Sequence, residues 1–111
     1  MPQTEQELFQ AMVDIIVLEV DPEQIILFGS RARGDARPDS DVDLIVVESK
    51  PFSVQRSRIK ETARLAMALA DVEVSKDLLL YSRDEFEARK DSFNHVVGRA
   101  FREGRVLYER T

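Results

Sequence analysis

The chain has 111 residues, of which 43% are apolar and 33% charged, so one folded domain spanning residues 1–111 is predicted and a disordered or collagen-like chain is excluded. The net charge of −5 argues against broad binding to nucleic acid or anionic lipid. The absence of cysteine excludes a disulfide scaffold and a thiol nucleophile. The apolar stretches are far shorter than the ~20 residues of a membrane span, and the sequence shows no secretory signal. We therefore expect a cytoplasmic protein.

The first half of the chain predicts a helix followed by two short buried strands. Residues 4–20 form the helix, because Thr4 and Glu7 have capping-box spacing and apolar residues recur at helical period until Asp21-Pro22. The apolar runs at 25–28 and 44–47 are too brief for core helices and are typical of buried strands. Residues 30–40 between them are polar and turn-forming.

The second half predicts two helices and two further strands. A long helix over 53–70 has four apolar residues along one face: Ile59, Ala63, Ala66 and Ala70. A strand over 77–81, which could begin near 72, precedes a helix start where Ser82 and Glu85 have capping-box spacing. An apolar helical stripe from Phe93 to Phe101 ends at Gly104, and 105–109 is suited to a short edge strand. Strands alternating with helices predict an α/β domain, whose strand order stays open.

Chemistry is indicated where Gly29-Ser30 is followed, after ten residues, by Asp41-Val42-Asp43. A helix starting at Gly29-Ser30 would offer exposed N–H groups to phosphate, with Ser30 as both N-cap and donor. In extended backbone Asp41 and Asp43 point to the same side, about 6.5–7 Å apart, and could share divalent cations. Asp77 opens the next strand with a similar pattern, so three carboxylates would meet if the two strands are neighbours. Such a triad with two metal ions suits in-line displacement at phosphorus.

The stretch ILFGSRARGDARPDSDVDLIVV resembles the signature region of the minimal nucleotidyltransferase (MNT) domains in the DNA polymerase β-type nucleotidyltransferase superfamily. That family's pattern is Gly-Ser, a ten-residue gap, Asp-x-Asp and a later isolated Asp on a strand. All are present here, as Gly29, Ser30, Asp41, Asp43 and Asp77, and residues 91–110 resemble the helix and strand that end such domains.

The resemblance implies a small α/β nucleotidyltransferase fold, with a mixed sheet of three to five strands flanked by helices. It implies transfer of a nucleoside monophosphate, AMP above all, from ATP or another NTP with Mg²⁺, two ions in all. Gly29, Ser30 and Arg33 would bind the nucleotide, and Asp41, Asp43 and Asp77 would hold the metal and carry catalysis, Asp77 as base.

The resemblance also implies a partner. Stand-alone MNT proteins are often encoded beside a helical HEPN protein, and in several pairs the MNT member is the antitoxin and adenylylates a tyrosine of the HEPN toxin. We therefore expect an antitoxin that modifies a HEPN-type partner, in a hetero- or homo-oligomer. Two alternatives stay open: a non-catalytic module that neutralises its partner by contact, and a small-molecule nucleotidyltransferase of the antibiotic-modifying type, which would need an acceptor domain that 111 residues leave little room for.

Several nearby residues have simpler interpretations. The basic patch of Arg31, Arg33 and Arg37 either pairs with surface carboxylates or binds phosphate or a partner. Asp35 and Asp39 are typical turn formers. A further set is expected to be structural or at the surface: His95, Tyr81 and Tyr108. The stripe from Phe93 to Phe101 is either core or partner interface.

Overall fold

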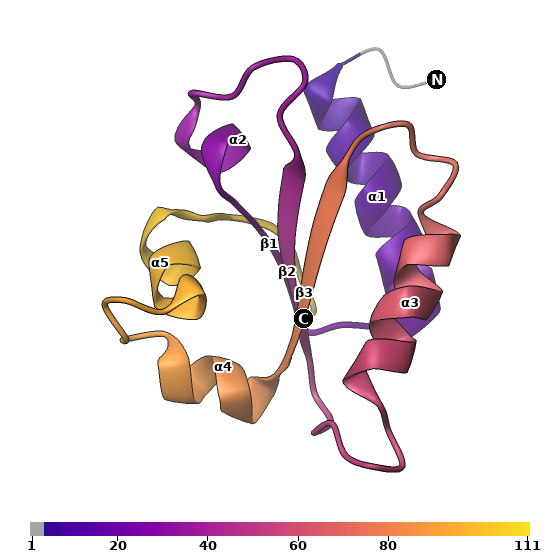
Figure 1. Cartoon of the computed structure of the whole chain (residues 1–111), viewed down its shortest axis with the longest axis vertical. Helices are drawn as coiled ribbons and strands as arrows, with labels where there is room; N and C mark the ends of the chain where they lie inside the picture. Colours follow the sequence, from indigo (N-terminus) through magenta and orange to yellow (C-terminus); the bar gives the residue numbers. More distant parts are fainter. Residues whose placement is uncertain (1–3) are drawn as a thin grey trace.

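The computed structural model describes residues 4–111 and shows one β-sheet with helices on both faces (Figure 1). Along the chain the elements are α1 Glu5–Val20, β1 Gln24–Phe28, α2 Ser30–Arg33, β2 Val42–Glu48, α3 Arg58–Ala68, β3 Lys76–Ser82, α4 Arg83–Arg89, α5 Val96–Glu103 and β4 Arg105–Glu109. The predicted α/β fold with a mixed sheet of three to five strands is confirmed. None of the helices in residues 4–111 combines the length and apolar character that crossing a membrane requires.

The four strands lie in the order β3-β2-β1-β4. Strand β1 runs antiparallel to both of its neighbours, whereas β2 and β3 run parallel. Because parallel neighbours begin at the same end of a sheet, β2 and β3 both start at the end where α2 lies (Figure 1). The two strands are therefore the neighbours that a convergence of Asp43 and Asp77 requires.

Two helix starts follow their predicted caps. The Thr4 side chain accepts the N–H of Glu7 at 3.1 Å and donates to the Glu7 carboxylate at 3.0 Å, which fixes the first turn of α1. The Ser82 side chain and Glu85 form a complete capping box at the start of α4. Hydrogen bonds between residues three positions apart therefore set both helix starts. At the other end of α1, Pro22 directly follows Asp21, whose backbone is left-handed.

Helix α3 is shorter than predicted and turns a different face to the sheet. It starts at Arg58 rather than near Ser53, because Ser53 and Arg56 close a separate turn through their backbones and Ser57 caps the helix instead. Its buried residues are Leu65 and, at its C-cap, Leu69. The predicted apolar face is exposed, with Ile59 81% accessible. Leu65 and Leu69, one turn apart, fill the core on one side of the helix, and the predicted face therefore lies outside the core.

Helix α5 also begins later than its apolar stripe. His95 is its N-cap, because its Nδ1 accepts the N–H of Val97 at 3.1 Å, so Phe93 lies before the helix and is 78% exposed. Gly104 caps the other end with extended backbone rather than the left-handed conformation of a C′ glycine. The edge strand predicted over 105–109 is confirmed as β4.

The two central strands are buried on both faces. Alternate residues of β1 and β2 pack under α1 and α3 in a core that contains Phe9, Met12, Val13, Ile16, Ile25, Leu27, Val42, Leu44, Val46, Leu65, Leu69 and Leu80. The intervening residues form a second core under α4 and α5, with Ile26, Ile45, Val47, Phe86, Val97 and Ala100. Tyr108 packs against the first core and Tyr81 against the second, as predicted. Burial on both faces explains the unbroken apolar runs.

Candidate functional site

Asp43 lies near the start of the central strand β2, among the residues predicted to form the site. It is half-buried and stands in register with Phe28 of β1 on one side and with Asp77 of β3 on the other. Neighbouring strands lie about 4.8 Å apart, so Asp43 and Asp77 are adjacent across the sheet. Alternation along β2 puts Asp43 on the same face as Ile45 and Val47, the face that α4 and α5 cover farther along.

Gly29, the residue directly after β1, completes this arrangement. Its φ of +75° belongs to a region that side chains disfavour, and a Cβ built on it would overlap Oδ2 of Asp43. The backbone and the carboxylate can approach this closely only because residue 29 has no side chain. The structure therefore brings together Gly29, Asp43 and Asp77, which are distant in the sequence.

The charges around Asp43 oppose its ionisation. Burial, followed by the carboxylates of Asp77 and Asp41, raises the pKa of Asp43 above its ordinary value. Arg33 and Arg31 act in the opposite direction. Asp43 therefore has two further carboxylates in its neighbourhood that arginine only partly balances, and a bound cation would stabilise this negative charge.

Asp41 and Ser30 lie next to the group formed by Gly29, Asp43 and Asp77. Asp41 is exposed on the loop immediately before β2. Ser30 is the first residue of the one-turn helix α2, not its N-cap as predicted; Gly29 holds the cap position, and no side-chain hydrogen bond caps the helix. The helix cap falls at Gly29 because the positive φ of this residue already turns the chain out of β1.

The basic patch divides into residues with different surroundings. Arg31 is nearly buried and is engaged with protein acceptors on several sides. Arg33 is 45% exposed and contacts Asp35 at 3.4 Å. Of these two residues, Arg33 has the guanidinium that a ligand from solution can reach.

The donor chemistry of the site suits a hard divalent cation, because carboxylate oxygens are the ligands that Mg²⁺ prefers. Burial and then the repulsion from Asp77 and Asp41 raise the pKa of Asp43, and such a cation would relieve the repulsion. As placed, the three carboxylates do not surround a common point: residues 4–111 hold no group of three or more His, Cys, Asp or Glu side chains spaced to hold a metal ion.

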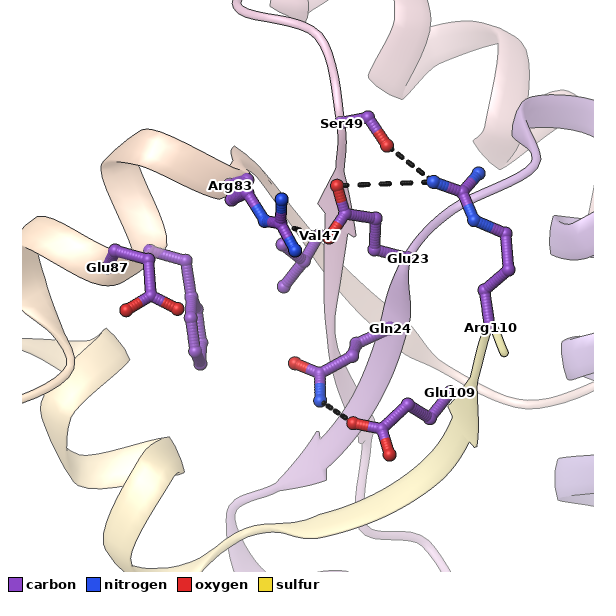
Figure 2. A pocket seen from close by; sticks show the side chains of 9 residues that line it. Glu23, Gln24, Val47, Ser49, Arg83, Glu87, Glu109 and Arg110 are labelled. Carbon is purple, nitrogen blue, oxygen red and sulfur yellow. Dashed lines mark hydrogen bonds and ion pairs between the residues drawn. The ribbon is translucent and has the colours of Figure 1, made fainter.

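Two features of the described residues lie outside the predicted site. Glu48, at the far end of β2, is 2% exposed beside Arg56 and Glu61. Its position directly after a buried apolar run is the signal that could have indicated its burial. A polar pocket of about 550 Å³ lies where β1 begins and β4 ends, lined in part by Arg83 and Arg110 (Figure 2). It contains none of the predicted site residues.

Comparisons with known proteins identify the family of the chain and proteins that share its fold. The family model "Polymerase beta, Nucleotidyltransferase" matches residues 10–111, which include every predicted site residue. A solved structure from Sulfolobus solfataricus, described as a nucleotidyltransferase, has a TM-score of 0.63 and 21% identity, over 95% of this chain and 80% of that protein. No curated protein sequence matches the chain.

Two further solved structures are toxin–antitoxin complexes. One, with AMP-PNP, has a TM-score of 0.59 and 20% identity. The other, a mutant of the toxin–antitoxin MntA-HpeT, has a TM-score of 0.58 and 18% identity. Each alignment covers 93% of this chain and 74% of the other. At these identities the likeness shows a shared fold.

Proposed function

The chain belongs to the polymerase β nucleotidyltransferase family, and from that premise we propose that it transfers a nucleoside monophosphate, AMP above all, from an NTP to a hydroxyl of a partner protein. The observation that carries the proposal is the position of Asp43. Its carboxylate lies against Gly29, which directly follows β1, and beside Asp77 of β3, so that the separate parts of the sequence pattern meet at one end of the sheet.

The proposed reaction forms one phosphorus–oxygen bond and breaks another. The acceptor hydroxyl oxygen attacks the α-phosphorus, pyrophosphate leaves, and Asp77 takes the hydroxyl proton. Gly29 and Ser30 would hold the triphosphate, since their backbone follows directly from β1, and Arg33 is exposed enough to reach it. Asp43, which lies between Gly29 and Asp77, would set the position of the triphosphate relative to Asp77.

Asp41, Asp43 and Asp77 are the residues that would hold Mg²⁺, as two ions in our proposal. When bound, the metal supplies charge neutralisation to the triphosphate and lowers the pKa of the attacking hydroxyl. The carboxylates' mutual repulsion supports this role, because it disfavours three bare charges at the site.

The proposed acceptor is a tyrosine of a HEPN-type toxin, with this chain as the antitoxin. Support comes from the two toxin–antitoxin complexes that share the fold, one of which contains AMP-PNP. The acidic surface of a chain with net charge −5 also disfavours a nucleic-acid acceptor.

The test is to incubate the purified protein with its co-encoded neighbour, Mg²⁺ and each NTP in turn, and to follow the neighbour's mass. The expected result is a gain of one nucleoside monophosphate, largest with ATP, on a tyrosine of that neighbour. No gain with any NTP would contradict the proposal. A neighbour that is neutralised equally well by the wild type and by Asp43→Asn would favour a module that acts by contact.

A further inference from the structure

The side chain of Arg31 is bound on three sides by the protein itself. Its Nε and Nη2 donate to the carbonyl oxygen of Ser40 at 3.1 and 2.7 Å, and Nη2 also donates to the carbonyl of Pro38 at 3.3 Å. Its Nη1 pairs with the Glu5 carboxylate of α1 at 2.9 Å. Only 9% of the side chain is exposed. Its charge and its donors are therefore used inside the protein rather than offered to a ligand.

These contacts hold the turn that leads into the acidic part of the site. Within this turn the N–H of Arg37 donates to Oγ of Ser40 at 2.8 Å, and the N–H of Ser40 donates to the carbonyl of Arg37 at 3.0 Å. On the far side of Asp41, the N–H of Val42 donates to the carbonyl of Ser75 at 2.8 Å. Asp41 thus lies between two anchored residues, one of them held by Arg31.

We propose that Arg31 is a positioning residue, which holds Ser40 so that Asp41 and Asp43 present their carboxylates together beside Gly29. The proposal rests on the proposed function, for which these carboxylates hold the metal that accompanies the nucleotide. It also gives a physical reason for the fixed gap between Gly29-Ser30 and Asp41: a loop of this length returns the Ser40 carbonyl to the guanidinium two residues after Gly29.

The role requires arginine rather than any cation. A planar guanidinium can donate two hydrogen bonds to one carbonyl, from Nε and Nη2, while Nη1 pairs with a carboxylate. Lysine offers one nitrogen on a flexible stem, so it can reach Glu5 or Ser40 but cannot reproduce the fork. We therefore expect Arg31→Lys to retain the fold and to recover only part of the function.

The test compares Arg31→Ala and Arg31→Lys with Arg110→Ala as a matched control. Arg110 also donates to a side chain, that of Ser49 (Figure 2), and to a backbone carbonyl, that of Asp21. It follows β4 where that strand pairs with the start of β1, so it lies at the opposite end of the sheet from Arg31. Two quantities are measured for each variant: the affinity for Mn²⁺·ATP by proton relaxation enhancement, and the hydrogen-exchange rate of the Ser40 amide.

For Arg31→Ala we expect affinity to fall about 10- to 100-fold, as for groups that orient metal ligands, with faster exchange at Ser40. Arg110→Ala should keep wild-type affinity and Ser40 exchange. Unchanged values in Arg31→Ala, or equal losses in both alanine variants, would overturn the proposal; if Arg31→Ala fails to fold, Arg31→Lys decides in the same way. If the wild type itself does not bind Mn²⁺·ATP, the proposed function fails. If the Ser40 amide exchanges as slowly in the Arg31 variants as in the wild type, Arg31 does not hold Ser40.

Discussion

Replacing Glu48 by glutamine should make the protein more stable above pH 7 and remove most of the pH dependence of its stability between about pH 5 and 7. Glu48 is buried, and its Oε1 accepts from Arg56 at 2.6 Å, while Oε2 has no hydrogen-bond partner among the described residues. Arg56 also binds Glu61 at 2.9 Å, so one guanidinium faces two carboxylates. A proton on Glu48 lets its carboxyl group donate a hydrogen bond to Glu61, which two carboxylates cannot form with each other.

The size of the effect follows from the pKa of Glu48. Burial, followed by Glu61, raises this pKa from 4.5 to about 7, against the opposing effect of Arg56. Because the folded protein then holds the proton more tightly than the unfolded chain, the stabilisation is complete below pH 4.5 and is lost as the pH rises through about 7. The loss corresponds to about 3 kcal/mol. Glutamine, the neutral isostere, should avoid it.

The assay is urea unfolding of the wild type and Glu48→Gln at several pH values between about 5 and 8.5, with the free energy of unfolding extrapolated to water. The wild type should lose stability across this range, whereas Glu48→Gln should stay nearly level and exceed the wild type at the alkaline end. Glu103→Gln, which changes an exposed glutamate of α5, serves as control and should follow the wild type. Parallel curves for the wild type and Glu48→Gln would show that Glu48 does not take up a proton on folding.

Three further predictions concern separate parts of the fold. Gly29→Ala should abolish Mn²⁺·ATP binding and cost more than about 1 kcal/mol of stability, measured by titration and urea unfolding, because a Cβ meets Asp43 and φ is +75°; wild-type binding would contradict the close approach. Ser82→Ala should lower stability by about 1 kcal/mol through loss of the α4 cap, and no loss in urea unfolding would refute that role. Leu65→Ala should cost about 2–5 kcal/mol, whereas Met67→Ala, 79% exposed, should cost under about 0.5; similar values would contradict the orientation of α3.

The parts of the fold that depend on neighbouring residues were predictable from the sequence. The caps at Thr4 and Ser82 involve partners three positions away, and the runs at 25–28 and 44–47 are recognisable because both faces of those strands are buried. The start of α3 was misplaced because two serines compete: Ser53 closes a turn with Arg56, and Ser57 caps the helix. Helix propensity does not tell which serine side chain caps the helix and which one closes a turn.

The parts of the site that depend on residues distant in the sequence could be predicted only on an assumption about which strands are neighbours. The adjacency of Asp43 and Asp77 follows from the parallel pairing of β2 with β3, which no local pattern specifies. Arg31 resembles its neighbour Arg33 in the sequence, yet one is nearly buried against Ser40 and the other is exposed. Arginine supplies both anchors and ligand contacts, so residue type alone does not distinguish the two roles.

The most direct test of the central claim is transfer of labelled AMP from ATP to the co-encoded neighbour by three proteins: the wild type, Asp43→Asn and Asp39→Asn. Asp39 is an exposed turn residue four positions before Asp43, so the same substitution there controls for the loss of one negative charge. We expect Asp43→Asn to lose transfer while keeping its fold, and Asp39→Asn to transfer at the wild-type rate. Transfer by Asp43→Asn at the wild-type rate would show that Asp43 does not act in the reaction.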